Sequence, residues 1–338
     1  DDIKQASIED LTEVSGVGSK TAEKILDGAN AEDDEEKAPS RRPSLDPVQK
    51  AAIRTLPGVG QKTIDSMVQA GFDSIESIHS VDPSELTDVS GIGTATAEKL
   101  KEAVKENGGT AQGFYPFADA VGIRAERVET GGDRVRFETT NGHRGLVEEV
   151  ALTELKEDGW EGIWANNQPW WAIGAYLYWD VIFAEIEGTY SPHLPFPSAR
   201  QDMPQDLFDA AFYSRREKLF AARSEELKRS NLKEELARAG NSHPAAHCRL
   251  IDPENVTGDL LLQLVDRTPD PLVLAICDRI FQDVRRHRRG LPDLFLWNDT
   301  ESRFAEVKSE NDSLGDHQRE WLDFLDEQGS RPMLVMVG

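Results

Sequence analysis

The stretch Gly290-Leu291-Pro292-Asp293, followed after a gap of twelve residues by Glu306-Val307-Lys308, decides the fold of this 338-residue chain. On a β-strand, residues two apart point to the same face, so Glu306 and Lys308 would lie side by side. Asp293 and Glu306 offer two carboxylates, the ligands that hard divalent cations prefer. A lysine beside such a cation can orient an attacking water or stabilise charge at phosphorus. The pattern therefore predicts a metal site suited to phosphodiester hydrolysis.

The flanking sequence predicts the elements that carry these residues. Residues 294–297 form an apolar run typical of a buried strand, and residues 303–308 return as a second strand after a turn cluster. Residues 314–328 have apolar positions at helical spacing, and residues 331–337 predict a last strand. The alternative is a solvated strand edge, on which Glu and Lys two apart are common. The order hairpin, helix, strand favours the core of a restriction-endonuclease-like nuclease.

Several further motifs, in the same order, resemble the VRR-NUC nucleases of the PD-(D/E)xK superfamily, above all the Fanconi-associated nucleases. These motifs are Val147 to Leu152, Tyr178 to Phe183, Met203 to Leu207, Ser214 to Arg216, Arg285 to Leu294, Glu306 to Lys308 and Asp316 to Leu322. The resemblance covers about residues 144–338. It implies an α/β restriction-endonuclease-like domain with helical insertions. It also implies a divalent-metal-dependent, structure-selective DNA nuclease that works in DNA repair.

The resemblance implies roles for individual residues. Asp293 and Glu306 would be metal ligands, and the carbonyl of Val307 would be a third. Lys308 would be the catalytic lysine, and Gln318 matches a glutamine that faces the active site in the family. The implied cofactor is Mg²⁺ or Mn²⁺.

One departure from the family bears on activity. The family carries a further metal-binding glutamate shortly before its Trp-Asp motif, and residues 164–170 of this chain contain no carboxylate. Three possibilities stay open: Asn166 or Asn167 coordinates through a carbonyl oxygen, Glu161 substitutes, or the metal site is weak. In the last case the chain would be a branched-DNA-binding protein that has lost cleavage.

Four arginines, Arg285, Arg286, Arg288 and Arg289, stand just before Asp293. A helix is expected over about residues 271–287, and cations in its last turn would complement the helix dipole. That accounts for one or two of them. The others, in an otherwise acidic chain, predict contact with DNA phosphates at the mouth of the site, because guanidinium groups bind phosphate with two hydrogen bonds.

A second signal lies in the N-terminal part, where a hydrophobic-x-Gly-hydrophobic-Gly pattern occurs three times before a helical run. Its glycines are Gly16 and Gly18, Gly58 and Gly60, and Gly91 and Gly93. The pattern resembles the helix-hairpin-helix motif, in which glycines allow a tight turn and direct N–H groups outward at the start of the second helix. Such a turn holds a DNA phosphate without reading sequence. The alternative is a helical protein-interaction domain that has lost DNA contact.

These signals divide the chain into five parts. We expect a helix-hairpin-helix motif at 1–30, an acidic and Pro/Ser-rich linker at 31–47, tandem helix-hairpin-helix motifs at 48–107, a connecting β element at 108–145, and the nuclease domain at 146–338 with its catalytic core at 271–338. The first motif is interpreted as half of a pair whose other half lies upstream.

Residues 194–216 and the helical pattern to about residue 238 resemble a helical insertion of the Fanconi-associated enzymes. That insertion is thought to oppose the dimer that cuts four-way junctions, so a monomer acting on DNA flaps or ends is expected. A junction resolvase of the same nuclease class is the rival interpretation. DNA would be held through its backbone, without sequence specificity.

Composition indicates the environment. The chain has 62 acidic and 38 basic residues, for a net charge of −24, the wrong sign for a protein that meets DNA. A halophile cytoplasm resolves the conflict, because molar salt screens charge within about 3 Å; an ordinary acidic protein is the alternative. Two cysteines indicate no disulfide framework, and neither a membrane span nor a secretory signal is evident. We therefore predict a cytoplasmic protein of a halophilic archaeon.

Overall fold

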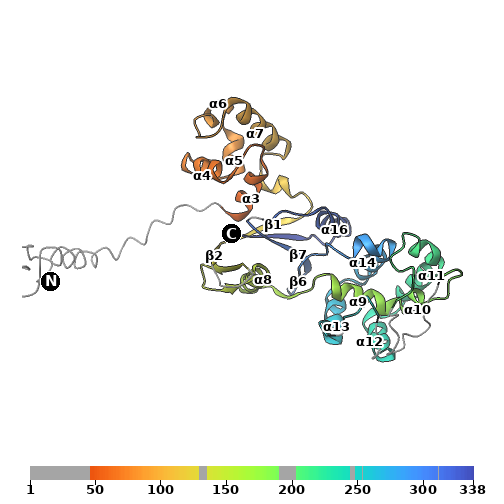
Figure 1. Ribbon diagram of the computed structural model, residues 1–338. Helices are drawn as coiled ribbons and strands as arrows, with labels where there is room; N and C mark the ends of the chain where they lie inside the picture. The colour runs from red at the N-terminus through yellow and green to blue at the C-terminus, as the bar shows by residue number, and fades with distance from the viewer. Residues whose placement is uncertain (1–45, 129–134, 190–202, 244–247, 253, 311) are drawn as a thin grey trace, which may run out of the picture. The chain divides into compact units, whose positions relative to one another are not determined.

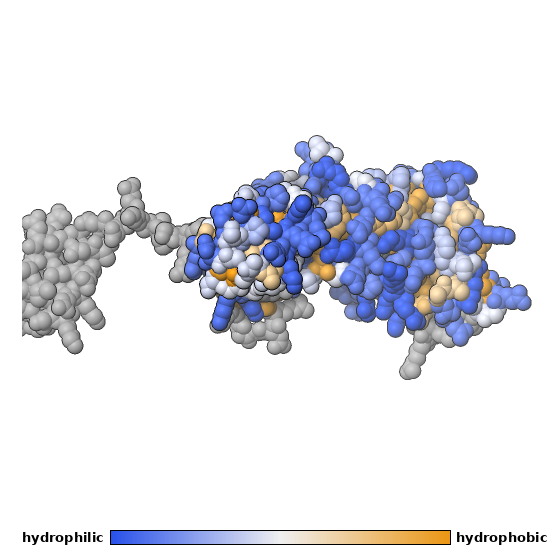
Figure 2. Space-filling model, turned by 90° about the horizontal axis from the view of Figure 1, so that it is seen from above, coloured by the Kyte–Doolittle hydropathy of each residue, from blue (hydrophilic) through white to orange (hydrophobic). Residues whose placement is uncertain are grey.

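The computed structural model describes residues 46–128, 135–189, 203–243, 248–252, 254–310 and 312–338. The first expected helix-hairpin-helix motif, with Gly16 and Gly18, lies outside the described residues, as does nearly all of the expected linker at 31–47. Within the described part of the chain, no helix is both long and apolar enough to cross a membrane. The surface in Figure 2 is mainly hydrophilic, with apolar residues in small patches.

A five-stranded mixed sheet carries the region singled out by the sequence. Its strands, in spatial order, are β1 (Asp119–Ile123), β8 (Met333–Val337), β7 (Ser302–Ser309), β6 (Leu294–Trp297) and β5 (Glu161–Trp164). Strands β1 and β7 pair parallel to β8, whereas β6 pairs antiparallel with both β7 and β5. The expected hairpin and last strand are confirmed, within two residues at each end.

Side-chain alternation along the strands separates the two faces of this sheet. Leu294, Leu296, Ala305 and Val307 pack with helix α8 (Val147–Glu157) on one face. The residues between them, including Phe295 and Phe304, pack with helices α9 (Asn167–Leu177), α14 (Asp270–Gln282) and α16 (Asp316–Glu327) on the other (Figure 1). Burying each such side chain stabilises the fold by roughly 1.5–3 kcal/mol. Because strand residues alternate, Glu306 and Lys308 share the face of Phe304 and lie toward α16.

A helical lobe separates β5 from β6, as expected for a nuclease domain with helical insertions. It consists of α9, α10 (Trp179–Ile182), α11 (Phe212–Leu227), α12 (Leu232–Ser242), α13 (Gly258–Arg267), α14 and α15 (Val284–His287). The single helix expected over residues 271–287 is in fact two. Asp283 interrupts it, with φ −153°, and its carboxylate accepts a hydrogen bond from the Arg286 N–H at 3.0 Å. A side chain that caps a new helix start explains the break.

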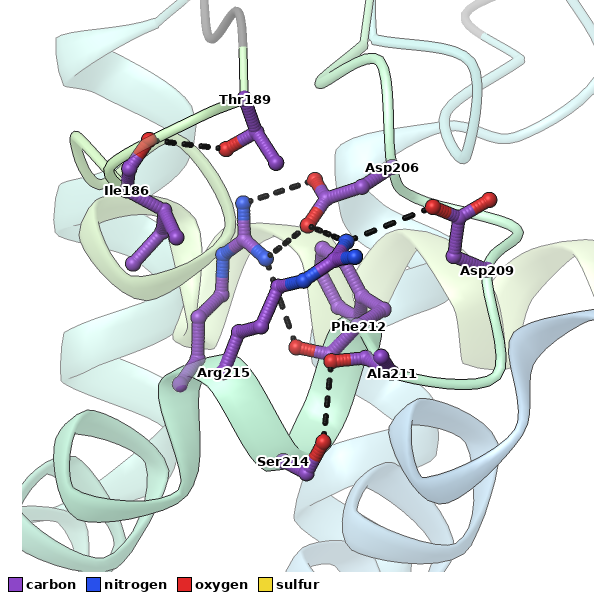
Figure 3. Close-up of polar contacts among 9 residues, drawn as sticks. Ile186, Thr189, Asp206, Asp209, Ala211, Phe212, Ser214 and Arg215 are labelled. Atoms are coloured by element: carbon purple, nitrogen blue, oxygen red, sulfur yellow. Dashed lines mark hydrogen bonds and ion pairs between the residues drawn. The ribbon is translucent and has the colours of Figure 1, made fainter.

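A buried ion pair between Asp206 and Arg216 holds the loop before α11 against that helix. Both guanidinium NH groups of Arg216 donate to the carboxylate of Asp206, at 2.8 and 2.9 Å, and both side chains are almost fully buried. Arg215 reaches the same carboxylate at 3.0 Å and also contacts exposed Asp209 (Figure 3). Burial alone would raise the pKa of Asp206, but these hydrogen bonds outweigh it and hold the pKa below its usual value.

The tandem helix-hairpin-helix region forms five helices, α3 (Pro47–Thr55), α4 (Gln61–Gln69), α5 (Ile75–Ser80), α6 (Pro83–Leu86) and α7 (Thr94–Glu106). Its apolar core continues into Leu322 of α16 and Leu334 and Met336 of β8. A one-turn 3-10 helix, η1 (Ala111–Phe114), then leads to β1. This part of the chain therefore packs directly on the nuclease sheet.

The connecting β element expected at residues 108–145 is divided between two sheets. Its first strand, β1, is an edge of the five-stranded sheet. The others, β2 (Ala125–Val128), β3 (Arg136–Thr139) and β4 (Arg144–Gly145), form a separate antiparallel sheet. Strand β1 thus belongs to the five-stranded sheet although it precedes residue 146, where the sequence predicts the start of the nuclease domain.

Candidate active site

The β6–β7 hairpin brings together the predicted acids and lysine. Leu294 pairs with Ala305, so Asp293, just before that pair, and Glu306, just after it, lie at the same end of the hairpin. The N–H of Val307 donates to Oδ2 of Asp293 at 3.1 Å. The Lys308 ammonium lies 2.7 Å from Oε1 of Glu306. The cluster expected from the sequence is therefore a single site.

Helix α16 adds the predicted glutamine to this cluster. The side-chain amide of Gln318 donates to Oε1 of Glu306, and its carbonyl oxygen accepts from the Gly315 N–H at 2.9 Å. Gln318 thus joins the start of α16 to the central acid. The Val307 N–H is used by Asp293, and the role of the Val307 carbonyl stays a prediction.

Burial makes both acids hard to ionise. Glu306 is fully buried, and burial, followed by repulsion from Asp293, raises its pKa to about 8 against the opposing effect of Lys308. Burial likewise raises the pKa of Asp293 to about 6, although the Val307 N–H and Lys308 lower it. Two acids whose charged forms disfavour each other are stabilised as anions by a nearby cation.

One oxygen of Glu306 is left without a hydrogen-bond partner. Oε1 receives Lys308 and Gln318, but Oε2 is buried and has no hydrogen-bond partner. An unsatisfied buried polar atom is costly and rare in native structures. A divalent cation between Glu306 and Asp293 would satisfy Oε2 and offset the repulsion, so the donor set suits Mg²⁺ or Mn²⁺.

A third carboxylate was missed by the sequence reasoning. Glu148, in the first turn of α8, is half-buried, and its charge raises the pKa of both Asp293 and Glu306. Its neighbour Glu149 instead accepts the Leu146 N–H at 2.8 Å and caps the helix. The sequence signal for it was the adjacent pair Glu148-Glu149, because capping the start of α8 requires only one of the two carboxylates.

Two of the three residues considered in place of the family's additional glutamate have other partners. Glu161 accepts a hydrogen bond from Nε1 of Trp297 at 2.8 Å, at the end of the β5–β6 pair farthest from Asp293, so it does not substitute. The side-chain oxygen of Asn167 accepts the Leu291 N–H at 3.1 Å and thereby holds the loop before Asp293. Asn166 is exposed and precedes α9.

The arginine run divides by environment. Arg286 forms an ion pair with Glu320, and the guanidinium of Arg288 lies 5.2 Å above the ring of Phe208. Arg285 and Arg289 are exposed. Arg286 is exposed as well, but Glu320 engages it. Intramolecular contacts thus account for two of the four, and phosphate contact stays a prediction that suits Arg285 and Arg289 best.

The two described hairpins pack against each other through their first glycines. Gly58 has a φ of 79° and Gly91 a φ of 93°, a region that favours glycine. A Cβ on Gly58 would lie 3.1 Å from the Thr96 side chain, and a Cβ on Gly91 would lie 3.8 Å from the Thr63 side chain. Thr96 and Thr63 belong to the first turns of α7 and α4, so the two helix starts are neighbours.

The second glycines leave those helix starts open. Gly60 and Gly93 precede α4 and α7 without any side-chain cap, and a Cβ on either would meet nothing within 4 Å. Unsatisfied N–H groups at two adjacent helix starts suit the binding of two phosphates.

Comparison with known proteins identifies the domains. Residues 225–337 match the VRR-NUC domain, residues 51–106 the SAM-like helix-hairpin-helix tandem, and residues 1–28 the helix-hairpin-helix motif. The Fanconi-associated nuclease 1 homolog of Schizosaccharomyces pombe is 30% identical over 211 residues, which is 60% of this chain and 29% of the relative. The Arabidopsis thaliana homolog is 28% identical over 206 residues, 59% of this chain and 22% of the relative. The matched part spans less than a third of either relative.

Two crystal structures of paFAN1 bound to 5′-flap DNA with a gap have a similar fold. The complex with a 2-nt flap aligns with 98% of this chain and 54% of that chain, at a TM-score of 0.52 and 22% identity. The complex with a 1-nt flap covers 99% and 59%, at a TM-score of 0.54 and 21% identity. This chain and the aligned part of paFAN1 thus share a helical N-terminal region followed by an α/β C-terminal domain.

Proposed function

We propose that this chain, which carries a VRR-NUC domain and helix-hairpin-helix motifs, is a divalent-metal-dependent, structure-selective DNA nuclease of DNA repair. The observation that carries the proposal is the buried Oε2 of Glu306, which lacks a partner beside a second carboxylate and a lysine. Similarity to Fanconi-associated nucleases supports DNA as the substrate. Flaps or ends are the structures we expect it to cut, as a monomer, which light scattering can check.

Each residue of the site has a task in this reaction. Asp293, Glu306 and Glu148 would hold Mg²⁺ or Mn²⁺, which when bound lowers the pKa of water and neutralises charge on the scissile phosphate. Lys308 holds an ammonium beside Glu306, where it can donate to the attacking water or to a phosphate oxygen. Gln318 fixes the orientation of the Glu306 carboxylate through Oε1 and leaves Oε2 for the cation.

The helix-hairpin-helix region would hold the DNA backbone next to this site. The open starts of α4 and α7 offer backbone N–H groups, which bind phosphate without sequence preference. The net charge of −24 opposes DNA binding at low ionic strength, so we propose that the protein works in the salt-rich cytoplasm of a halophile. Backbone N–H groups and a bridging cation depend less on counterion release than exposed lysines do.

The test of the proposed function is cleavage of end-labelled 5′-flap DNA in high KCl with Mn²⁺. The wild type should release labelled product and Asp293→Ala should not. Asp209→Ala, which removes an exposed carboxylate in the helical lobe, is the matched control and should cleave as the wild type does. Absence of cleavage by all three proteins would overturn the proposal.

A second candidate function is the recognition of branched DNA without cleavage. The lack of a carboxylate at residues 164–170, which read Asn166-Asn167 in the region where the family carries a glutamate, favours it. Titration with Mn²⁺ separates the two candidates, because an inactive site would bind the cation weakly, whereas Glu148, Asp293 and Glu306 together would bind it tightly.

Stabilisation by Mn²⁺ should increase with pH. The pKa of Asp293 is raised to about 6 and that of Glu306 to about 8, so below pH 6 the cation must displace protons from both acids. We expect the Mn²⁺-induced rise in melting temperature to be small at pH 6 and to grow toward pH 8. At about 100 times the dissociation constant the stabilisation would be about 2.7 kcal/mol. Differential scanning calorimetry over this range, with and without Mn²⁺, measures it; an increment independent of pH would contradict the assigned ligands.

Aspartate at the two open helix starts should weaken phosphate binding without unfolding the hairpins. In Gly60→Asp and Gly93→Asp the new side chain meets no neighbour, and aspartate is a favourable N-cap, so the melting temperature should hold or rise. Its charge would repel DNA phosphate, and we expect about tenfold weaker binding for each substitution. Fluorescence anisotropy with labelled duplex measures it. Gly258→Asp, in the first turn of α13, where Thr257 already caps the helix, adds the same charge elsewhere and should bind normally.

A further inference from the structure

The helix-hairpin-helix region packs on the face of the sheet that carries the candidate active site. Helix α3 contacts α4 within this region and also β1 and β8 of the sheet (Figure 1). Leu334 and Met336 of β8 belong to the same buried apolar cluster as the two hairpins. The strand register pairs Leu334 with Glu306, and it pairs Met336 with Lys308. Because cross-strand partners point to the same face, the hairpins adjoin the part of the sheet that bears the acid and the lysine.

Two cations of α3 reach the end of β7. Lys50 forms an ion pair with the carboxylate of Glu310, and NH1 of Arg54 donates to the backbone carbonyl of Glu310. Glu310 lies two residues after Lys308, and its N–H donates to the backbone carbonyl of Val337 in β8 at 3.1 Å. Helix α3 thus holds the end of the strand that bears the candidate catalytic lysine.

Arg54 also reaches α4. Its NH2 donates to Oε1 of Gln61, which is the first residue of α4 and directly follows Gly60. Asp65, one turn later, accepts the side-chain amide of Gln61 at 2.9 Å and so keeps Oε1 turned toward Arg54. The guanidinium is planar and rigid, so its two bonded nitrogens fix their two acceptors relative to each other. One side chain therefore joins the helix start that suits a DNA phosphate to the end of the catalytic strand.

We propose that Arg54 is a positioning residue that determines which phosphodiester is cut. The inference rests on the proposed function and adds to it a fixed spacing between the DNA phosphate held at α4 and the metal site. With Arg54 in place, a phosphate at the start of α4 has one position relative to Lys308. Without it, apolar packing still holds the hairpins on the sheet, but α4 can shift. A displacement of about 1 Å can lower a rate by up to about a hundredfold.

Cleavage of end-labelled 5′-flap DNA in high KCl with Mn²⁺, resolved to single nucleotides, tests the position of the cut. The wild type should give one main product. Arg54→Met should spread the products to neighbouring phosphodiesters and lower kcat about tenfold, with little change in KM. Lys50→Met removes the same charge and a contact with the same Glu310, but no bond to α4 among the described residues, and should cut where the wild type does.

Arg54→Lys separates the bridge from the charge. Lysine keeps the positive charge, but one ammonium lacks the rigid fork that holds both acceptors, so this variant should resemble Arg54→Met. The inference is overturned if Arg54→Lys restores the wild-type products, or if Arg54→Met cuts at the same position and rate as Lys50→Met.

Gln61→Ala breaks the other end of the bridge at an exposed side chain, where loss of the fold is not expected. It should spread the products as Arg54→Met does. The double variant Arg54→Met/Gln61→Ala should be no worse than Arg54→Met alone, because both substitutions remove one link. Losses that add in the double variant would contradict the bridge.

Hydrogen exchange tests the bridge without turnover. Saturating duplex DNA should slow exchange of the Glu310 N–H in the wild type, and the same DNA should have no such effect in Arg54→Met. If the wild type never cleaves but shows this Arg54-dependent slowing, the proposed function fails and the positioning role stands. If the wild type cleaves and Arg54→Met changes neither the products nor the exchange, the positioning role fails and the nuclease stands.

Discussion

Glu306→Gln is expected to lower the rate of flap cleavage by roughly a thousandfold or more. The substitution keeps the size of the side chain and the oxygen that receives Lys308 and Gln318. It removes the negative charge at Oε2, the buried atom without a partner. A neutral amide binds a hard divalent cation far more weakly than a carboxylate does. Removal of a single group that stabilises transition-state charge already costs about 10²–10³ in rate, and here the cation itself is lost.

The same substitution is expected to stabilise the metal-free protein at pH 8. Burial and repulsion from Asp293 raise the pKa of Glu306 to about 8, against 4.5 for an unperturbed glutamate. The folded state therefore holds a proton that the unfolded state has released between pH 4.5 and pH 8. Stability falls as pH rises through that window, because the unfolded state binds fewer protons. Glutamine has no charge to bury, so the melting temperature of Glu306→Gln should exceed that of the wild type at pH 8 and approach it near pH 5.

Cleavage assays and calorimetry on one pair of proteins test both effects. Circular dichroism should show the same secondary structure, and Mn²⁺ should no longer raise the melting temperature of Glu306→Gln. Lys308→Met is a useful comparison, because it removes the ion that lowers the pKa of Glu306 and should destabilise the metal-free protein instead. If Glu306→Gln is less stable than the wild type at pH 8, the electrostatic account of this site is wrong.

The sequence predicted the strands of the active site because their periodicity is local. The apolar run at 294–297 and the Glu-x-Lys pair at 306–308 each have one orientation on a β-sheet, so the hairpin and its acids follow from spacing alone. The helix-hairpin-helix glycines are similarly local. Gly58 and Gly91 adopt positive φ. Gly60 and Gly93 directly precede helices whose first N–H groups have no side-chain cap.

Glu148 was not predictable in this way because its role depends on tertiary packing. In the sequence it stands at the start of a helix, where acids are favourable for the dipole alone. Only the packing of α8 on the sheet brings it to Asp293 and Glu306. Likewise, only the folded chain shows that Asn167 holds Leu291 and that β1 pairs with β8 across more than two hundred residues. Long-range contacts of this kind leave no periodic pattern in a single sequence.

Asp206→Ala is expected to destabilise the protein by about 3–5 kcal/mol. Arg216 is fully buried, and both of its NH groups bond to Asp206, while its Nε has no partner. Removing the carboxylate leaves a guanidinium in the apolar core with only the Phe212 carbonyl, at 3.3 Å, to receive its hydrogen bonds. Urea unfolding monitored by circular dichroism should show the loss as a lower midpoint. Asp209→Ala, which removes an exposed partner of Arg215, should change stability by less than about 1 kcal/mol.

A double variant separates the cost of an unpaired charge from the value of the ion pair. In Asp206→Leu/Arg216→Met no charge remains to be buried, and apolar replacements of similar size are often neutral or stabilising. We therefore expect the double variant to recover most of the stability that Asp206→Ala loses. If it is as unstable as the single variant, the pair contributes a net stabilisation that burial of apolar groups cannot replace. Either result is independent of the metal site, because the pair lies in the helical lobe between β5 and β6.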